Sequence, residues 1–121
     1  MTTWLLLLSF CIVLITILLI LHFLRNREVY EYYSDTKPKL LHRDWKLHKG
    51  RKNGEEHVYY RTGELNRTKM WINGVLNGAS VVYFKTGQPY IESFYKNGKI
   101  VGMYTVFGLD GKIIEHRHYE K

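Results

Sequence analysis

The chain is poor in cysteine and lacks the motifs of the common enzyme families. Its one cysteine, Cys11, lies inside a long apolar segment, so the rest of the sequence can form neither a disulfide framework nor a thiolate zinc site. No phosphate-binding loop, dinucleotide-binding glycine fingerprint, nucleophile elbow or zinc-protease helix occurs. These absences predict a protein that is not an enzyme and that uses no cofactor.

Asp, Glu, Lys and Arg are all absent from the first 24 positions. Residues 5–24 are apolar apart from Ser9, Thr16 and His22, and about 20 residues at about 1.5 Å each span the roughly 30 Å of a bilayer's hydrocarbon. A cleaved signal peptide would need a basic start, a shorter apolar core and a small-residue cleavage site, none of which is present. We therefore predict an uncleaved transmembrane anchor over residues 1–24.

The charge of the chain lies entirely after this segment. There are 18 Lys and Arg against 11 Asp and Glu, a formal net charge of +7, and basic residues favour the cytoplasmic side of a span. We expect a single-pass membrane protein whose C-terminal domain is cytoplasmic; because acidic residues are interleaved, a periplasmic or extracytoplasmic domain is the alternative. The basic residues closest to the span are Arg25, Arg27, Lys37, Lys39 and Arg43.

Composition changes abruptly at residues 25–34, RNREVYEYYS, which we interpret as a juxtamembrane linker. Tyrosine rings gather at the level of the lipid headgroups, and Tyr30, Tyr32 and Tyr33 suit that position. In the alternative interpretation, these tyrosines form the first strand of the domain that follows.

Glycines recur every 24 residues through the rest of the chain, which indicates a stack of similar small units. Copies of about 31–54, 55–78, 79–102 and 103–121 make up a repeat domain over residues 35–121, and the first copy is the most divergent. The recurring positions are Gly50, Gly74 and Gly98; Gly54, Gly78 and Gly102; and Gly63, Gly87 and Gly111.

Within each copy, short aromatic and β-branched runs are bounded by glycine turns, a pattern typical of β-hairpins. SVVYFK at 80–85 leads to Thr86-Gly87, and PYIESFYK at 89–96 leads to Asn97-Gly98. No stretch after the anchor has helical periodicity. We predict an all-β repeat domain, an elongated sheet of consecutive antiparallel hairpins, preceded by one N-terminal transmembrane α-helix. The expected turn glycines are Gly63, Gly74, Gly87, Gly98 and Gly111.

Aligned columns of the repeat predict a core. A two-stranded hairpin cannot bury its apolar face alone, so stacked hairpins would give equivalent side chains continuous partners. The columns are Val58, Val82 and Val106; Tyr59, Tyr83 and Phe107; and Trp71, Tyr95 and Tyr119.

The repeated pattern resembles that of the MORN-repeat-variant family. It reads V-Y-aromatic-basic-T-G, then about seven residues, then aromatic-x-N-G-x-x-x-G, and it rests on VYYRTG, WINGVLNG, VVYFKTG, YKNGKIVG and VFGLDG. The match covers residues 55–121 clearly and 31–54 weakly. Bacterial members are often labelled antitoxin components of toxin–antitoxin modules, so the resemblance implies an antiparallel sheet of hairpins and an antitoxin or immunity role. The Y-x-G-x-W opening of the standard MORN repeat is not found here.

Because no catalytic set accompanies the repeats, we expect a non-enzymatic module that binds a protein partner, most concretely a neutraliser of a cognate toxin or effector. Tyr, Trp and basic side chains frequently anchor such interfaces. The candidate contacts are Trp71, Tyr83, Tyr95, Lys69, Lys85 and Lys96.

The alternative function is a structural tether whose basic sheet associates with anionic membrane lipids, since each basic residue near such a surface contributes about 1 kcal/mol. Its candidate residues are Arg25, Arg27, Lys46, Lys49, Arg51 and Lys52. Nucleic acid is not expected, because no RNA-binding signature is present. His116 and His118 would lie on the same face of a strand, but without a third ligand they predict no metal site.

Overall fold

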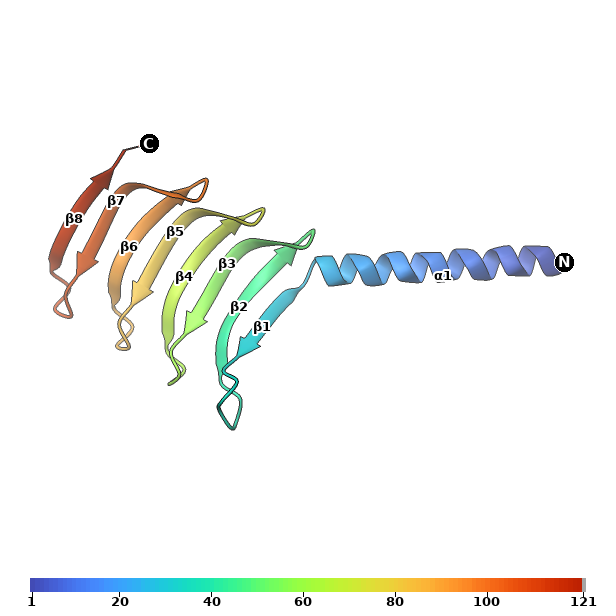
Figure 1. Ribbon diagram of the computed structural model, residues 1–121, viewed down its shortest axis with the longest axis horizontal. Helices are drawn as coiled ribbons and strands as arrows, with labels where there is room; N and C mark the ends of the chain where they lie inside the picture. Colours follow the sequence, from blue (N-terminus) through green and yellow to red (C-terminus); the bar gives the residue numbers. More distant parts are fainter. Residues whose placement is uncertain (121) are drawn as a thin grey trace.

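The computed structural model describes residues 1–120, which form one apolar helix followed by a single antiparallel sheet (Figure 1). The elements are α1 (Thr2–Arg25), β1 (Glu28–Tyr32), β2 (Leu41–His48), β3 (Arg51–Tyr59), β4 (Leu65–Ile72), β5 (Val75–Tyr83), β6 (Pro89–Lys96), β7 (Lys99–Phe107) and β8 (Ile113–Tyr119). The strands lie in the sheet in their chain order, so every neighbouring pair belongs to consecutive hairpins. The predicted fold class is confirmed.

Helix α1 is long and apolar enough to cross a membrane. None of its residues is buried against the sheet, so its apolar surface is left for another apolar environment. Figure 1 shows the sheet continuing away from the end of the helix, with β1 beside α1 and β8 farthest from it. With α1 embedded in lipid, the sheet would therefore project from the membrane surface as a ribbon.

The hairpins close with two kinds of turn, one at each edge of the ribbon. Two-residue turns join β2 to β3, β4 to β5 and β6 to β7; in the second of these, Asn73 and Gly74 have φ of 50° and 83°, as type I′ turns require. Three-residue turns close the opposite edge: Tyr60 N donates to Glu64 O at 2.8 Å, and Gly63 takes the left-handed position with φ 99°. Gly87 and Gly111 occupy the equivalent positions.

Half of the segment at residues 25–34 is strand, since β1 covers Glu28–Tyr32, which agrees with the alternative interpretation of a first strand rather than with a linker. β1 pairs with β2, so that Val29 lies opposite Trp45, and only two residues separate β1 from α1. The loop after β1 is longer than its later counterparts, since Tyr33 N donates to Leu40 O at 2.9 Å across it. This extra length displaces β1 from the 24-residue spacing, which is why the repeat pattern does not reveal the strand.

Consecutive copies are tied together at the edge with the three-residue turns. Tyr33 Oη donates to Tyr59 O at 2.9 Å, and Tyr60 Oη donates to Tyr83 O at 2.7 Å. The Arg61 guanidinium lies 5.1 Å from the centroid of the Tyr33 ring, within the range of a cation–π contact. These links add side-chain contacts to the backbone ladder.

The prediction of an apolar core is wrong. Among the described residues no apolar side chain is buried, and the columns that begin with Val58, Tyr59 and Trp71 are only half-buried. A one-layer sheet has no second layer to cover either face. The side chains that do become buried are polar: Glu56, Thr68, Ser80 and Thr105.

Candidate functional site

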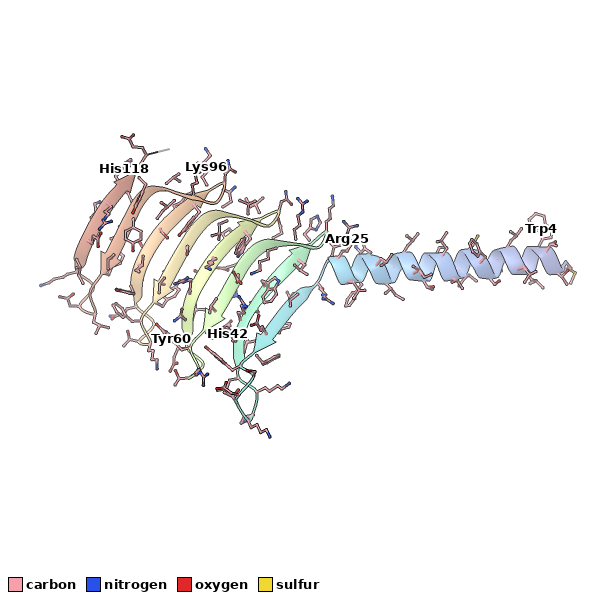
Figure 2. The ribbon with its side chains drawn as sticks, in the orientation of Figure 1. Trp4, Arg25, His42, Tyr60, Lys96 and His118 are labelled. Carbon is pink, nitrogen blue, oxygen red and sulfur yellow. The ribbon has the colours of Figure 1, made fainter. Side chains whose placement is uncertain are left out.

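Side chains project alternately from the two faces of the sheet (Figure 2), as the period of a strand requires. The tryptophan face is defined here by Trp45, Glu56, Lys69, Trp71, Ser80 and Tyr95, which the strand register places on one side. The histidine face is defined by Asp44, His57, Thr68, Met70, Phe94 and His116.

A charged network occupies the tryptophan face near the helix. Glu56 is only 2% exposed, and its carboxylate accepts hydrogen bonds from Lys52 Nζ at 2.6 Å and Trp71 Nε1 at 2.8 Å. The Lys52 ammonium lies 4.7 Å from the centroid of the Trp45 ring and 4.8 Å from that of Trp71. A buried charge is tolerated only when it is paired, and Glu56 is paired with Lys52. Because Lys52 contacts both indole rings and Glu56 bonds that of Trp71, the network holds the rings in defined positions.

Beside this network the tryptophan face is hollowed into a groove of about 250 Å³. β4 supplies two cations, β5 and β6 supply serine hydroxyls, and β6 and β7 supply tyrosine rings, with aliphatic side chains between them. The polar lining residues are Arg67, Lys69, Ser80, Ser93, Tyr95 and Tyr104.

Neither cation of the groove has an acidic partner within the part of the chain that the structure describes. The Nε atom of Arg67 is buried without a hydrogen-bond acceptor. Burial lowers the pKa of the Lys69 ammonium; Glu56 opposes this by attraction, and Arg67 and Lys52 add repulsion. Because Glu56 is already bound to Lys52, an anion entering the groove would satisfy Arg67 and stabilise the charge of Lys69.

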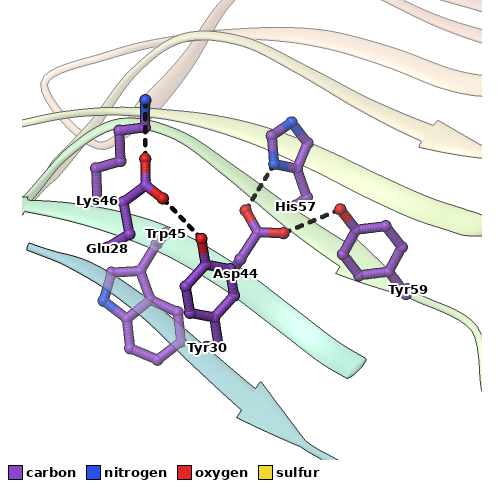
Figure 3. Close-up of a pocket in the computed structure, with 7 residues that line it drawn as sticks. All are labelled: Glu28, Tyr30, Asp44, Trp45, Lys46, His57 and Tyr59. Atoms are coloured by element: carbon purple, nitrogen blue, oxygen red, sulfur yellow. Dashed lines mark hydrogen bonds and ion pairs between the residues drawn. The ribbon is translucent and has the colours of Figure 1, made fainter. Parts of the chain in front are cut away.

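A second polar cluster lies on the histidine face beside β1 (Figure 3). Asp44 accepts a hydrogen bond from Tyr59 Oη at 2.9 Å and pairs with His57 Nδ1 at 2.8 Å, while His57 Nε2 lies 3.4 Å from Glu55. Burial and the bond to Asp44 raise the pKa of Tyr59 to about 12. Both imidazole nitrogens thus face carboxylates, an arrangement that suits a structural role better than that of a free general base.

The structure separates the six residues expected to contact a partner. Lys69, Trp71 and Tyr95 lie together on the tryptophan face. Tyr83 follows a register shift and, like its repeat equivalent Tyr59, belongs to the opposite face. Lys85 lies 5.5 Å from the Tyr60 ring at the edge with the three-residue turns, and Lys96 lies next to a two-residue turn at the other edge.

The groove also contains residues that sequence reasoning did not select. Arg67 lies two positions before Lys69 on β4, and Ser80 and Ser93 lie beside Lys69 across the ladder. The signal that could have identified them was the strand alternation combined with hairpin register. Serine and arginine at strand positions look solvent-exposed when the register is not known.

The expected lipid-facing residues also separate. Arg25, Lys49 and Arg51, together with His48 and Asn73, line an open hollow of about 400 Å³ beside the end of α1, and Arg27 is exposed nearby. Lys46 instead lies 3.3 Å from Glu28 on the histidine face. Lys52 is not available to lipid, since its ammonium is bound by Glu56.

No group of three or more His, Cys, Asp or Glu that could hold a metal ion occurs among residues 1–120. His116 lies within 3.4 Å of the Thr105 hydroxyl. Comparison of the chain with protein-family models, with curated proteins and with solved structures found no match.

Proposed function

We propose that this protein is a membrane-anchored, non-enzymatic binding module whose tryptophan face recognises an acidic segment of a protein partner. The observation that carries this proposal is the presence of Arg67 and Lys69 in a groove lined by tyrosines. Both cations are partly buried, and neither has a counter-ion among residues 1–120. Partly buried cations that lack an acidic partner within the described residues are suited to a binding partner that supplies one.

The chemistry of the groove defines what would fit. A carboxylate can accept two parallel hydrogen bonds from an arginine, and Tyr95 and Tyr104 offer apolar ring surface together with hydroxyl groups. A stable interface buries about 800 Å² on each partner, so the groove would anchor the contact and the rest of the exposed face would complete it.

The anchor and the ribbon shape support a role at a membrane surface. α1 has the length and composition of a span, and the following basic residues favour a cytoplasmic sheet. The resemblance to MORN-repeat variants supports a concrete version, in which the sheet neutralises a toxin or effector by covering its functional surface. A sheet lying flat on lipids has less support, because Lys46 and Lys52 are already paired.

Charge reversal in the groove tests this proposal. Full-length tagged protein is cross-linked in its native membrane, and stoichiometric partners are identified by mass spectrometry. Arg67→Glu/Lys69→Glu should reduce recovery of the partner at least about tenfold, since losing a buried charge pair at an interface costs about 2–5 kcal/mol. Lys99→Glu/Lys112→Glu changes the net charge equally at exposed sites and should leave recovery unchanged.

Tryptophan fluorescence of each purified variant establishes that the sheet is folded. Equal recovery of the partner by the groove variant and by wild type would refute recognition through the tryptophan face. A wild-type protein that repeatedly yields no stoichiometric partner would refute the binding function itself.

A further inference from the structure

The turn between β2 and β3 is fastened to the end of the helix. Gly50 N donates to Arg25 O at 2.8 Å, and Lys49 N donates to the side-chain oxygen of Asn26 at 2.8 Å. Leu47 N adds a bond of 2.7 Å to Arg27 O. Three hydrogen bonds therefore hold this turn beside the last residue of α1.

The position of Arg25 sets the depth of this turn in a bilayer. Arg25 is the first charged residue after the apolar segment, and a run of about 20 apolar residues spans the hydrocarbon, so the next residue lies among the headgroups. The turn bonded to Arg25 lies at that same level, where lipid phosphates are concentrated.

Three cations lie there without a counter-ion in the part of the chain that the structure describes. Arg25, Lys49 and Arg51 line one open hollow of about 400 Å³, and none of them forms an ion pair with a described residue. Nearby carboxylates are engaged elsewhere: Glu28 with Lys46 at 3.3 Å and Glu56 with Lys52 at 2.6 Å. An anion that bound between these exposed cations would gain a favourable Coulomb interaction with all three.

The backbone of this turn provides independent support. Lys49 has φ 50°, a left-handed conformation that residues other than Gly, Asn and Asp adopt reluctantly. The equivalent positions in the later turns are Asn73 and Asn97, with φ of 50° and 51°. The turn beside the helix thus carries a cation where the other two turns carry the residue that the backbone prefers.

We propose that Arg25, Lys49 and Arg51 form a site for the headgroup phosphate of an anionic phospholipid. The site rests on the membrane anchor of the proposed function, but it involves neither the tryptophan face nor the protein partner. The bound lipid offsets part of the positive charge of the junction and fixes the orientation of the sheet relative to the bilayer. His48 lines the same hollow and adds a further hydrogen-bond donor.

Lipid selectivity of the full-length chain tests the site. The protein is incorporated into nanodiscs of equimolar phosphatidylcholine and phosphatidylglycerol, and native mass spectrometry measures the ratio of the two lipids that remain bound. Wild type should retain phosphatidylglycerol preferentially, and each lost cation should reduce that preference about fivefold. The test variants are Lys49→Asn, which installs the preferred turn residue and so should fold at least as well, and Arg51→Gln.

Lys99→Gln is the matched control. Lys99 follows the Asn97-Gly98 turn as Arg51 follows the Lys49-Gly50 turn, but Lys99 begins β7, far from the helix. The control should keep the wild-type preference. The site would be overturned if the wild type entered nanodiscs but showed no preference for phosphatidylglycerol. It would also be overturned if Lys99→Gln lost that preference as much as the test variants do. Loss of the preference in millimolar inorganic phosphate would show that the hollow takes free phosphate instead and would also overturn it. Failure to enter nanodiscs would refute the anchor itself.

Discussion

Removing the buried carboxylate of Glu56 should strongly destabilise the sheet. Glu56→Ala leaves the Lys52 ammonium and the Trp71 indole N–H without their acceptor, which lies at 2.6 Å and 2.8 Å respectively. Breaking a buried ion pair by removing one partner costs about 3–5 kcal/mol. The Lys52 side chain remains 25% exposed, so water offsets part of this loss. We therefore expect Glu56→Ala to lower the free energy of unfolding by about 3 kcal/mol. That is a large share of the roughly 5–15 kcal/mol that stabilises a typical domain.

Urea unfolding of the full-length protein in detergent micelles, followed by tryptophan fluorescence, measures this loss. Trp45 and Trp71 flank Lys52 and report on the network directly. Glu56→Gln keeps an acceptor for the indole but removes the charge, so it should lose about 1–2 kcal/mol. Lys52→Met/Glu56→Ala removes the unpaired cation as well and should be more stable than Glu56→Ala alone.

Two outcomes would refute this reasoning. A loss below about 1 kcal/mol for Glu56→Ala would mean that the carboxylate stabilises no more than an exposed ion pair does. The double variant Lys52→Met/Glu56→Ala is also compared with Lys52→Met and Glu56→Ala alone. If its loss of unfolding free energy is at least the sum of the two single losses, Lys52 and Glu56 do not stabilise one another.

Two further predictions concern a backbone bulge and a titrating phenol. Gly78→Ala places a Cβ 2.9 Å from the Cβ and Cγ atoms of Met70, whereas the Cβ of Gly54→Ala meets open space. Both variants incur the strain of a positive φ, about 1–2 kcal/mol. In the same urea assay, Gly78→Ala should therefore lower the free energy of unfolding by about 1–3 kcal/mol more than Gly54→Ala does. Equal losses would show that the Met70 contact relaxes freely. The folded state raises the pKa of Tyr59 from 10.0 to about 12, so the unfolded chain releases this proton first and the free energy of unfolding should fall as pH rises between these values. Tyr59→Phe should remove that part of the pH dependence, and an unchanged slope would contradict it.

Local signals in the sequence were sufficient to predict most of the elements. The apolar segment predicted α1, and pairs such as Asn73-Gly74 and Asn97-Gly98 predicted hairpins because only a few residues accept the positive φ of their turns. The repeat pattern did not decide between a linker and a first strand at residues 25–34, because the longer loop before Leu40 breaks the period. A repeat pattern identifies strands only where the connecting loops keep a constant length.

The candidate groove was predictable only in part. Lys69, Trp71 and Tyr95 were selected for their chemistry, and strand alternation brings them onto one face. Arg67 and Glu56 were not selected, because a charged residue on a strand ordinarily lies in solvent. Their burial depends on neighbours from adjacent strands, which are known only when the register is known.

The sequence by itself determined that an apolar helix precedes a ribbon of hairpins. Turn-forming residue pairs and the length of an apolar segment are local properties of the chain, so they can be read without knowing the tertiary structure. The tertiary structure alone decided that the ribbon stays one layer thick, with polar rather than apolar side chains at its most protected positions. It also decided which cations have no counter-ion among the described residues. The physical reason is that burial and charge pairing depend on distances between residues of different strands, and the register of the ladder sets those distances.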